Sequence, residues 1–343
     1  MGRKGDINVL IIGSNKIASY KIGIEQPLRY LEQKGVCSFD VRSDDELNKS
    51  RIGEADIVIF FRTVQHEAYK YLEMAHEMGK KTVYVIDDHF LAMSPDSDIG
   101  RYYHESSRRK TYVKFLKNAQ IVKVASSFFA RHLETHFQPN KIVYFPGSVD
   151  FSIISGLKKK KKTENQIIIG YEGGRKPVAF APVIKALDEI LRKYGDKIRI
   201  EFCGYAPDEL VNKSQVHTEP YDENYKKFLK RLYRSSWDIG LAPLERTLLH
   251  DCKSNNKFRE YSACRIPGIY TSSPAYEEWV QNKESGLVAS ETSEDWYEAI
   301  VELIEQPELR QNIAEHAEKI AWENFSIEAC AECWRSQILM RSN

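Results

Sequence analysis

The segment DIGLAPLERTLLHDCKSNNKFREYSACRIPGIYT, residues 238–271, decides the fold of the second half of the chain. It opens with a short apolar run at Ile239–Pro243 and passes through a polar loop into a helical pattern at Asn256–Cys264. A second apolar run follows at Gly268–Thr271. A strand, a helix and a second strand in this order are typical of a parallel sheet with helices packed on it. The segment therefore predicts an α/β domain.

The same alternation continues outward in both directions. The other predicted strands are Asn8–Gly13, Asp56–Phe61, Thr82–Asp87, Ile121–Ala125, Lys141–Phe145, Gln166–Tyr171 and Lys197–Cys203. The predicted helices are Pro27–Lys34, Glu67–Met78, Tyr102–Lys117, Ser127–His136, Ala181–Tyr194, Tyr221–Ser235 and a long helical tail at Ser293–Ile338. The pattern thus predicts a separate set of βα units in each half of the chain.

The bulk properties favour two globular domains. A chain of 343 residues exceeds one ordinary α/β core. Its 42% hydrophobic and 29% charged residues and its net charge of +1 exclude a disordered or nucleic-acid-coating protein, so we expect no nucleic-acid partner. The lysine run Lys158–Lys162 cannot enter a core and predicts a solvated linker; a site for anionic lipid or another polyanion is the alternative.

The compartment is predicted to be the cytoplasm. The first apolar run is too short for a signal peptide or a membrane span, and no other stretch reaches spanning length. Six scattered cysteines without a leader favour reduced thiols. Peripheral contact with the inner face of the membrane remains an option.

Residues 238–290 resemble the donor-binding signature of retaining GT-B glycosyltransferases, in particular family four, the group 1 glycosyl transferases. The match consists of Lys253, Ser254, Lys257, Glu260, Tyr261, Ala263 and Pro267. The stretch IIIGYEGGRKPVAFAPVIKALDEIL is similar to the first βα unit of that family's C-terminal domain. The first half is similar only loosely, through its order of elements, an aspartate pair before a helix, the Ser126–Leu133 segment and the run YFPGSVD.

The resemblance implies two Rossmann-like domains facing each other across a cleft. We expect an acceptor domain at 1–155, a lysine-rich linker at 156–165, a nucleotide-sugar domain at 166–320 and a C-terminal helix at 321–343 that crosses back to the first domain. It also implies a hexosyl- or related glycosyltransferase of polysaccharide biosynthesis. Such an enzyme moves a sugar from a nucleotide-diphosphate donor to a hydroxyl of a glycan, glycolipid or protein, with retention and without a metal or other cofactor.

The donor site is expected around Glu260. An ionised carboxylate can accept hydrogen bonds from both ribose hydroxyls, and the alternative is an exposed helix residue paired with Lys257. Gly173 and Gly174 would let backbone amides approach a phosphate, while Arg175 and Lys176 would offset its charge and act catalytically.

Further residues complete the predicted substrate-binding set. The resemblance places Lys253 near the donor sugar or phosphate. Ser254 and Asn255 precede the Glu260 helix, whose positive end favours anions, although Asn255 could be only an N-cap. Lys257, Tyr261 and Gly13, in the turn after the first strand, are also assigned to this set.

The aspartate pair Asp87–Asp88 allows two interpretations. Paired aspartates can bind Mg²⁺ or Mn²⁺. We instead expect no metal, because cationic side chains can balance the pyrophosphate. In the family that the chain resembles, this rim faces the acceptor hydroxyl, so Asp88 and His89 become catalytic candidates that orient the acceptor; Asp88 as a helix N-cap is the alternative.

Two departures from the family pattern leave alternative functions open. Cys252 stands where a glutamate is usual, and Arg265 replaces a glycine. A catalytically inactive GT-B-like subunit that stabilises a partner enzyme is therefore the first rival. A dehydrogenase or an epimerase acting on nucleotide sugars is the second, but it needs a GxGxxG motif, of which only Gly13 is present.

Overall fold

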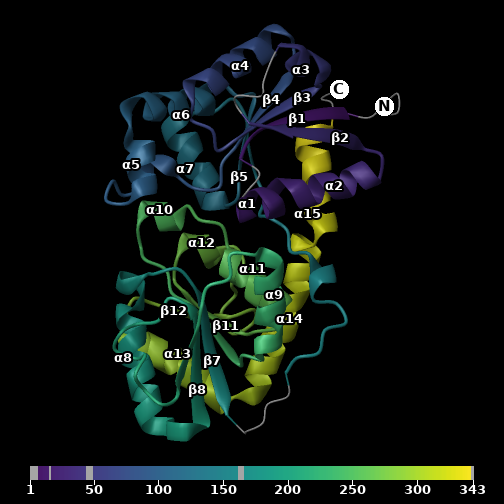
Figure 1. Cartoon of the computed structure of the whole chain (residues 1–343). Helices are drawn as coiled ribbons and strands as arrows, with labels where there is room; N and C mark the ends of the chain where they lie inside the picture. Colours follow the sequence, from purple (N-terminus) through teal and green to yellow (C-terminus); the bar gives the residue numbers. More distant parts are fainter. Residues whose placement is uncertain (1–6, 15–16, 44–48, 161–165, 341–343) are drawn as a thin grey trace. The chain divides into compact units, whose positions relative to one another are not determined.

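The computed structural model describes residues 7–14, 17–43, 49–160 and 166–340 (Figure 1). The chain divides into two compact units. Unit 1 comprises Met1–Ser148, Asp251–Ser254 and Phe325–Asn343, and unit 2 comprises Val149–His250 and Asn255–Asn324. The predicted linker is described only up to Lys160, whose backbone N–H donates to Arg234 O at 3.4 Å within unit 2; Lys161 and Lys162 lie outside the described residues.

Unit 1 is built on a six-stranded parallel sheet in the order β2-β1-β3-β4-β5-β6. Its strands are β1 (Ile7–Gly13), β2 (Cys37–Arg42), β3 (Ile57–Phe61), β4 (Lys81–Val85), β5 (Ile121–Val124) and β6 (Ile142–Tyr144). Its helices include α1 (Ala18–Tyr20), η1 (Lys21–Glu25), α2 (Gln26–Gln33), α3 (Lys49–Glu54), α4 (His66–Glu77), η3 (Phe90–Ala92), α5 (Asp98–His104), α6 (Ser106–Asn118), α7 (Ser127–Phe137), α15 (Ile327–Trp334) and η6 (Arg335–Leu339).

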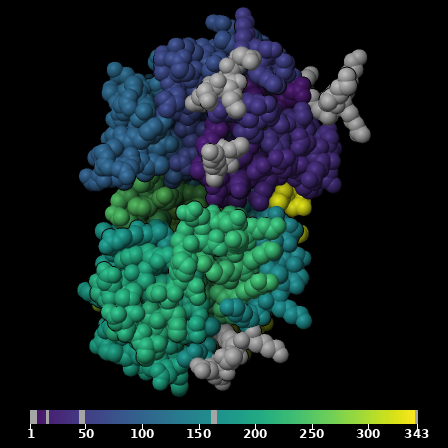
Figure 2. All heavy atoms as spheres, viewed as in Figure 1, coloured from purple at the N-terminus to yellow at the C-terminus, as the bar shows by residue number. Residues whose placement is uncertain are grey.

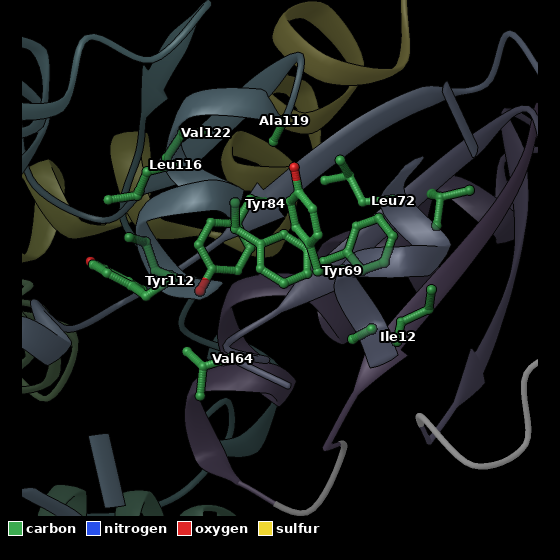
Figure 3. Packing of buried hydrophobic residues seen from close by; sticks show 14 of the residues in the cluster. Ile12, Val64, Tyr69, Leu72, Tyr84, Tyr112, Leu116, Ala119 and Val122 are labelled. Atoms are coloured by element: carbon green, nitrogen blue, oxygen red, sulfur yellow. The ribbon is translucent and has the colours of Figure 1, made fainter. Parts of the chain in front are cut away.

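Apolar side chains cover both faces of this sheet. On one face, Leu72, Tyr84, Tyr112 and Leu116 pack in a cluster with residues of β3, β4, α4 and α6 (Figure 3). On the other face, α2 packs together with α15 and η6 from the end of the chain. Trp334 is fully buried there and donates its Nε1–H to Gly23 O at 2.9 Å.

Unit 2 repeats the architecture, with a parallel sheet in the order β12-β11-β10-β7-β8-β9. Its strands are β7 (Ile167–Gly173), β8 (Ile198–Gly204), β9 (Val216–Glu219), β10 (Ile239–Ala242), β11 (Gly268–Thr271) and β12 (Leu287–Ala289). Its helices include η4 (Phe151–Ile153), α8 (Pro177–Tyr194), η5 (Gly195–Lys197), α9 (Tyr225–Ser235), α10 (Leu248–Asp251), α11 (Asn256–Ala263), α12 (Pro274–Glu277), α13 (Ser293–Glu305) and α14 (Pro307–Phe325). The surface of unit 2 in the view of Figure 2 includes the exposed side of α9.

The prediction of an α/β fold with two Rossmann-like parallel sheets is confirmed. Three edge strands, β2, β9 and β12, escaped the sequence pattern: β2 and β9 mix polar and apolar residues, and β12 is only three residues long. The single helix expected at Tyr102–Lys117 is two helices, since Glu105 adopts an extended ψ of 129° between them. No helix in the described ranges combines the length and hydrophobicity that a membrane crossing requires.

An aromatic ring packed on a glycine holds β7 and β10 together in unit 2. Gly170 pairs with Gly240 across the two strands, and the Trp237 ring occupies the space that a side chain at Gly170 would need. Trp237 is buried and its Nε1–H donates to Glu201 Oε2 at 2.8 Å. Packing on Gly170 and the hydrogen bond to Glu201 therefore fix the position of the ring.

We predict that Gly170→Ala lowers the free energy of unfolding by about 1–3 kcal/mol, because the added methyl group overlaps the Trp237 ring. Gly53→Ala is the matched control: nothing lies within 4 Å of its added Cβ on the exposed face of α3. That change should stabilise by roughly 0.5–1 kcal/mol. Denaturant unfolding measures both, and equal effects would contradict the packing argument.

Candidate functional site

The first candidate site lies where β7 ends and α8 begins in unit 2. Gly173 has φ +153°, and a Cβ there would come within 2.6 Å of the Tyr171 hydroxyl. That hydroxyl donates to Gly174 O at 3.0 Å and so holds the loop in place. Lys176 is the N-cap of α8 but makes no side-chain cap, and exposed Arg175 lies 5.9 Å from the Tyr205 ring centroid. A glycine loop followed by two cations and a helix N-terminus suits an anionic ligand.

Three buried charges lie beside this loop: Glu172 from β7, and Lys257 and Glu260 from α11. Lys257 Nζ is 2.5 Å from Glu172 Oε2 and 3.4 Å from Glu260 Oε2. Glu172 and Glu260 are only 4% and 6% exposed, so water screens the cluster poorly. The pairing of Glu260 with Lys257 that the sequence offered as an alternative is present, but it is buried.

The surroundings shift the pKa of each partner. Burial raises the pKa of Glu260; Lys257 opposes the rise and Glu172 adds to it, and the result lies above the usual value. Burial alone would lower the pKa of Lys257, but Glu260 and Glu172 raise it well above its usual range. Lys257 is therefore a permanent cation, shared by two carboxylates that compete for it.

Two members of the predicted set on this helix are interior residues. Tyr261 is fully buried and donates its hydroxyl to Leu241 O at 2.8 Å, which fastens α11 to β10. Asn255 occupies the N-cap position of α11, is 2% exposed and makes no side-chain cap. Lys257 and Glu260 are thus the helix residues that carry charge next to the β7 loop.

Sequence reasoning missed Tyr221, which borders the same cluster. Its ring packs on Gly204, where an added Cβ would lie 3.4 Å from Tyr221 Cδ2. Tyr221 is nevertheless 57% exposed. Glu172, Lys257 and Glu260 all act electrostatically on its hydroxyl. An exposed tyrosine before a helix carries no sequence signal of its own.

The second candidate site lies at the ends of β3 and β4 in unit 1. Arg62, which follows β3 with φ +56°, places Nη1 3.0 Å from Asp87 Oδ2 and Nη2 3.9 Å from Asp88 Oδ2. Lys253 Nζ lies 3.4 Å from Asp88 Oδ1. Burial raises the pKa of Asp87, and Arg62 opposes the rise. Asp88 is therefore held between two cations, and the residue at the N-cap of the next turn is His89, not Asp88.

His89 points into an aromatic enclosure. It is 3% exposed, and its ring centroid is 5.4 Å from that of Phe129 and 4.8 Å from that of His132. Burial, reinforced by His132, His136 and Arg109, lowers the pKa of His89 to about 4. The ring is therefore neutral at pH 7.

The predicted site residues thus divide between the two units. Unit 1 holds Gly13, Asp88, His89, Lys253 and Ser254, and unit 2 holds Gly173, Gly174, Arg175, Lys176, Asn255, Lys257, Glu260 and Tyr261. Gly13 has φ +143°, and an added Cβ would lie 2.5 Å from Phe61 O, which explains the glycine by packing against β3. Within the described ranges, no group of three or more His, Cys, Asp or Glu side chains forms a metal-binding cluster.

Two six-stranded parallel sheets with flanking helices define a GT-B architecture. No protein-family model matches the chain. No curated protein sequence matches it either.

Solved structures match the fold over nearly the whole chain. A glycosyltransferase from Rickettsia africae is 16% identical, with a TM-score of 0.72, and the match covers 97% of this chain and 98% of that one. HepE from Anabaena, crystallised with UDP and glucose, is 12% identical, with a TM-score of 0.70 and coverage of 97% and 99%. A putative UDP-N-acetylglucosamine 2-epimerase from Listeria monocytogenes is 11% identical, with a TM-score of 0.60 and coverage of 97% and 96%. At these identities the likeness establishes the GT-B fold.

We predict that the buried His89 makes unit 1 sensitive to acid. Its pKa is about 4 when folded against 6.5 when exposed, so the unfolded chain binds the extra proton first. The contribution of neutral His89 to the free energy of unfolding is fully present above pH 6.5. It falls by about 3 kcal/mol as the pH drops to 4.

His89→Gln should lose less stability than the wild type between pH 6.5 and pH 4 in denaturant titrations. The exposed His66 offers the control, because His66→Gln should follow the wild-type curve. If the free energy of unfolding of His89→Gln falls with pH as steeply as that of the wild type, the His89 ring does not take up a proton on unfolding.

Proposed function

We propose that the chain is a glycosyltransferase that moves a hexosyl or related sugar from a nucleotide-diphosphate sugar to an acceptor hydroxyl. The observation that carries the proposal is one strand end in unit 2 that unites a glycine loop, a helix N-terminus and a buried carboxylate pair. These are the groups that the phosphates and the ribose of a nucleotide require. The GT-B fold supports the same reading.

The nucleoside half of the donor would bind at Glu260 and Tyr221. Glu260 Oε2 faces Lys257, so the other carboxylate oxygen is the acceptor for ribose hydroxyls. The exposed ring of Tyr221 gives a flat surface beside these carboxylates, on which a base can stack. Gly204, which has no side chain, lets the ring lie close to the backbone of β8.

The diphosphate would bind at the β7–α8 loop. The amides of Gly173 and Gly174 and the start of α8 supply donors, and Arg175 and Lys176 supply positive charge. As the bond from C1 to the phosphate oxygen breaks, negative charge grows on the leaving diphosphate. Donors fixed beforehand around that charge lower the barrier.

Acceptor chemistry is assigned to Asp88 and Lys253 in unit 1. The acceptor oxygen bonds to C1 on the face that the diphosphate leaves, and the hydroxyl proton passes to a departing phosphate oxygen. This is retention, and it needs no protein nucleophile. Asp88, held by Arg62 and Lys253, would orient the hydroxyl, while the buried His89 supports the turn from within. We propose that cationic side chains replace a metal ion.

A nucleotide-sugar epimerase is the second candidate, because the likeness to the Listeria protein extends over the whole chain. The two activities differ in product. An epimerase alters the sugar of the donor without an acceptor, whereas a transferase needs one. Incubation with a panel of nucleotide sugars, with and without acceptors, separates them, and an inactive subunit would change no donor at all.

We predict that Glu260→Ala weakens nucleotide binding by about 1.5–3 kcal/mol, the usual contribution of hydrogen bonds to a charged group. Calorimetry with the nucleotide sugar that most stabilises the wild type in a thermal-shift panel measures the loss. Glu245→Ala on the loop after β10 is the control, because this partly exposed carboxylate lies outside the cluster. Unchanged affinity in a folded Glu260 variant would remove Glu260 from the site.

Asp88→Asn should slow turnover and leave nucleotide affinity nearly intact, because Asp88 belongs to unit 1 and the nucleotide groups belong to unit 2. The product should keep the anomeric configuration of the donor, as read from its anomeric proton signal by NMR. Both assays are run in excess EDTA. An inverted anomer, or activity that EDTA abolishes and Mn²⁺ restores, would contradict the mechanism.

A further inference from the structure

Glu172 has a role that the nucleotide contacts alone do not explain. It lies on β7, 85 residues before Lys257, and it makes the shorter of the two contacts to the lysine ammonium. Its side chain is 5% exposed, so it is not a surface partner added for solubility. Burying two carboxylates around one ammonium costs desolvation energy that packing alone would avoid. The arrangement therefore calls for a function beyond stability.

The geometry shows what Glu172 does to its neighbours. It holds the Lys257 ammonium at 2.5 Å, and the ammonium makes a longer contact of 3.4 Å to Oε2 of Glu260. A ribose needs a carboxylate with a free oxygen and a fixed direction. Without Glu172, Lys257 would pair with Glu260 alone. The lysine would then compete with the ribose for the carboxylate oxygens of Glu260.

We propose that Glu172 is a positioning residue of the nucleotide site, which restrains Lys257 and thereby sets the orientation and the charge of Glu260. The inference rests on the proposed function and extends it to the regulation of the same site. Because Glu172 is a nearby negative charge, it also makes Glu260 harder to ionise. Nucleotide binding should then weaken in acid, when Glu260 takes up a proton.

Other ionisable groups face Glu260 from several elements. They are Lys257 and Arg259 on α11, Glu172 on β7, Tyr221 before α9, Tyr225 on α9, Cys264 after α11 and Tyr276 on α12. The tyrosines and Cys264 have pKa values raised by burial and remain neutral in acid. Glu260, whose pKa burial raises, is therefore the group of this set that we expect to take up a proton in mild acid.

The test is the pH dependence of nucleotide-sugar affinity by calorimetry at pH 5 and pH 8. UDP-glucose is the probe, because its phosphodiester groups do not titrate in this range. The wild-type Kd should rise about tenfold or more from pH 8 to pH 5, as expected for a carboxyl whose protonation blocks binding. In Glu172→Gln the rise should shrink to less than about threefold, because Glu260 ionises more easily without its negative neighbour.

Two further variants make the result specific. Glu201→Gln removes a carboxylate on the adjacent strand β8 that binds Arg199 and Trp237, and it should keep the wild-type pH ratio. Lys257→Gln should act with the opposite sign, moving the loss of affinity toward higher pH, and it supplies the test if Glu172→Gln fails to fold. Equal pH ratios in the wild type and Glu172→Gln, or a wild type whose affinity ignores pH, would overturn the inference while leaving nucleotide binding intact. Failure of the wild type to bind any nucleotide sugar would overturn the proposed function together with it.

Discussion

The burial of both faces of each parallel sheet is the constraint on which the rest of the structure depends. Every residue of β3 is buried, as is every residue of β10 and β11, so these strands have no polar face. A charged side chain loses the least hydration energy at the edge of such a sheet where the strands end. Arg62 directly follows β3, Asp87 and Asp88 come shortly after the end of β4, and Glu172 is the last residue but one of β7. The charged residues of the two candidate sites therefore lie at or just beyond strand ends, where the chain leaves the apolar interior.

Much of the fold follows from local pattern, because a strand that is buried on both faces must be continuously apolar. Most central strands of both sheets were predictable for this reason, whereas β8 alternates apolar and charged residues in IRIEFCG. The edge strands β2, β9 and β12 were not: a strand with one neighbour can carry polar residues, as VHTE in β9 does. The break between α5 and α6 also left no periodic signal, since one residue with an extended ψ interrupts an otherwise helical stretch.

The candidate site was predictable only where its chemistry is local. Gly173, Arg175 and Glu260 belong to recognisable segments, and the structure locates them at the rim of one sheet. Glu172 and Arg62 could not be found in this way, because their partners lie far along the chain. Tyr261 shows the converse limit: it adjoins Glu260 in sequence, yet the turn of the helix directs it into the core. A motif specifies residue types, whereas the direction of each side chain depends on packing.

The last helix of the chain has a consequence for the order in which the protein is built. Residues Ala331, Trp334, Ile338 and Leu339 complete one face of the first sheet, and Lys81 Nζ at the start of β4 donates to Ile338 O and Met340 O, each at 2.9 Å. A ribosome releases β1 well before these residues. Unit 2, which ends at Asn324, has all of its chain before unit 1 does. The unit whose synthesis begins first is therefore the last to complete its core, and one face of its sheet stays uncovered until residues 331–339 have been made.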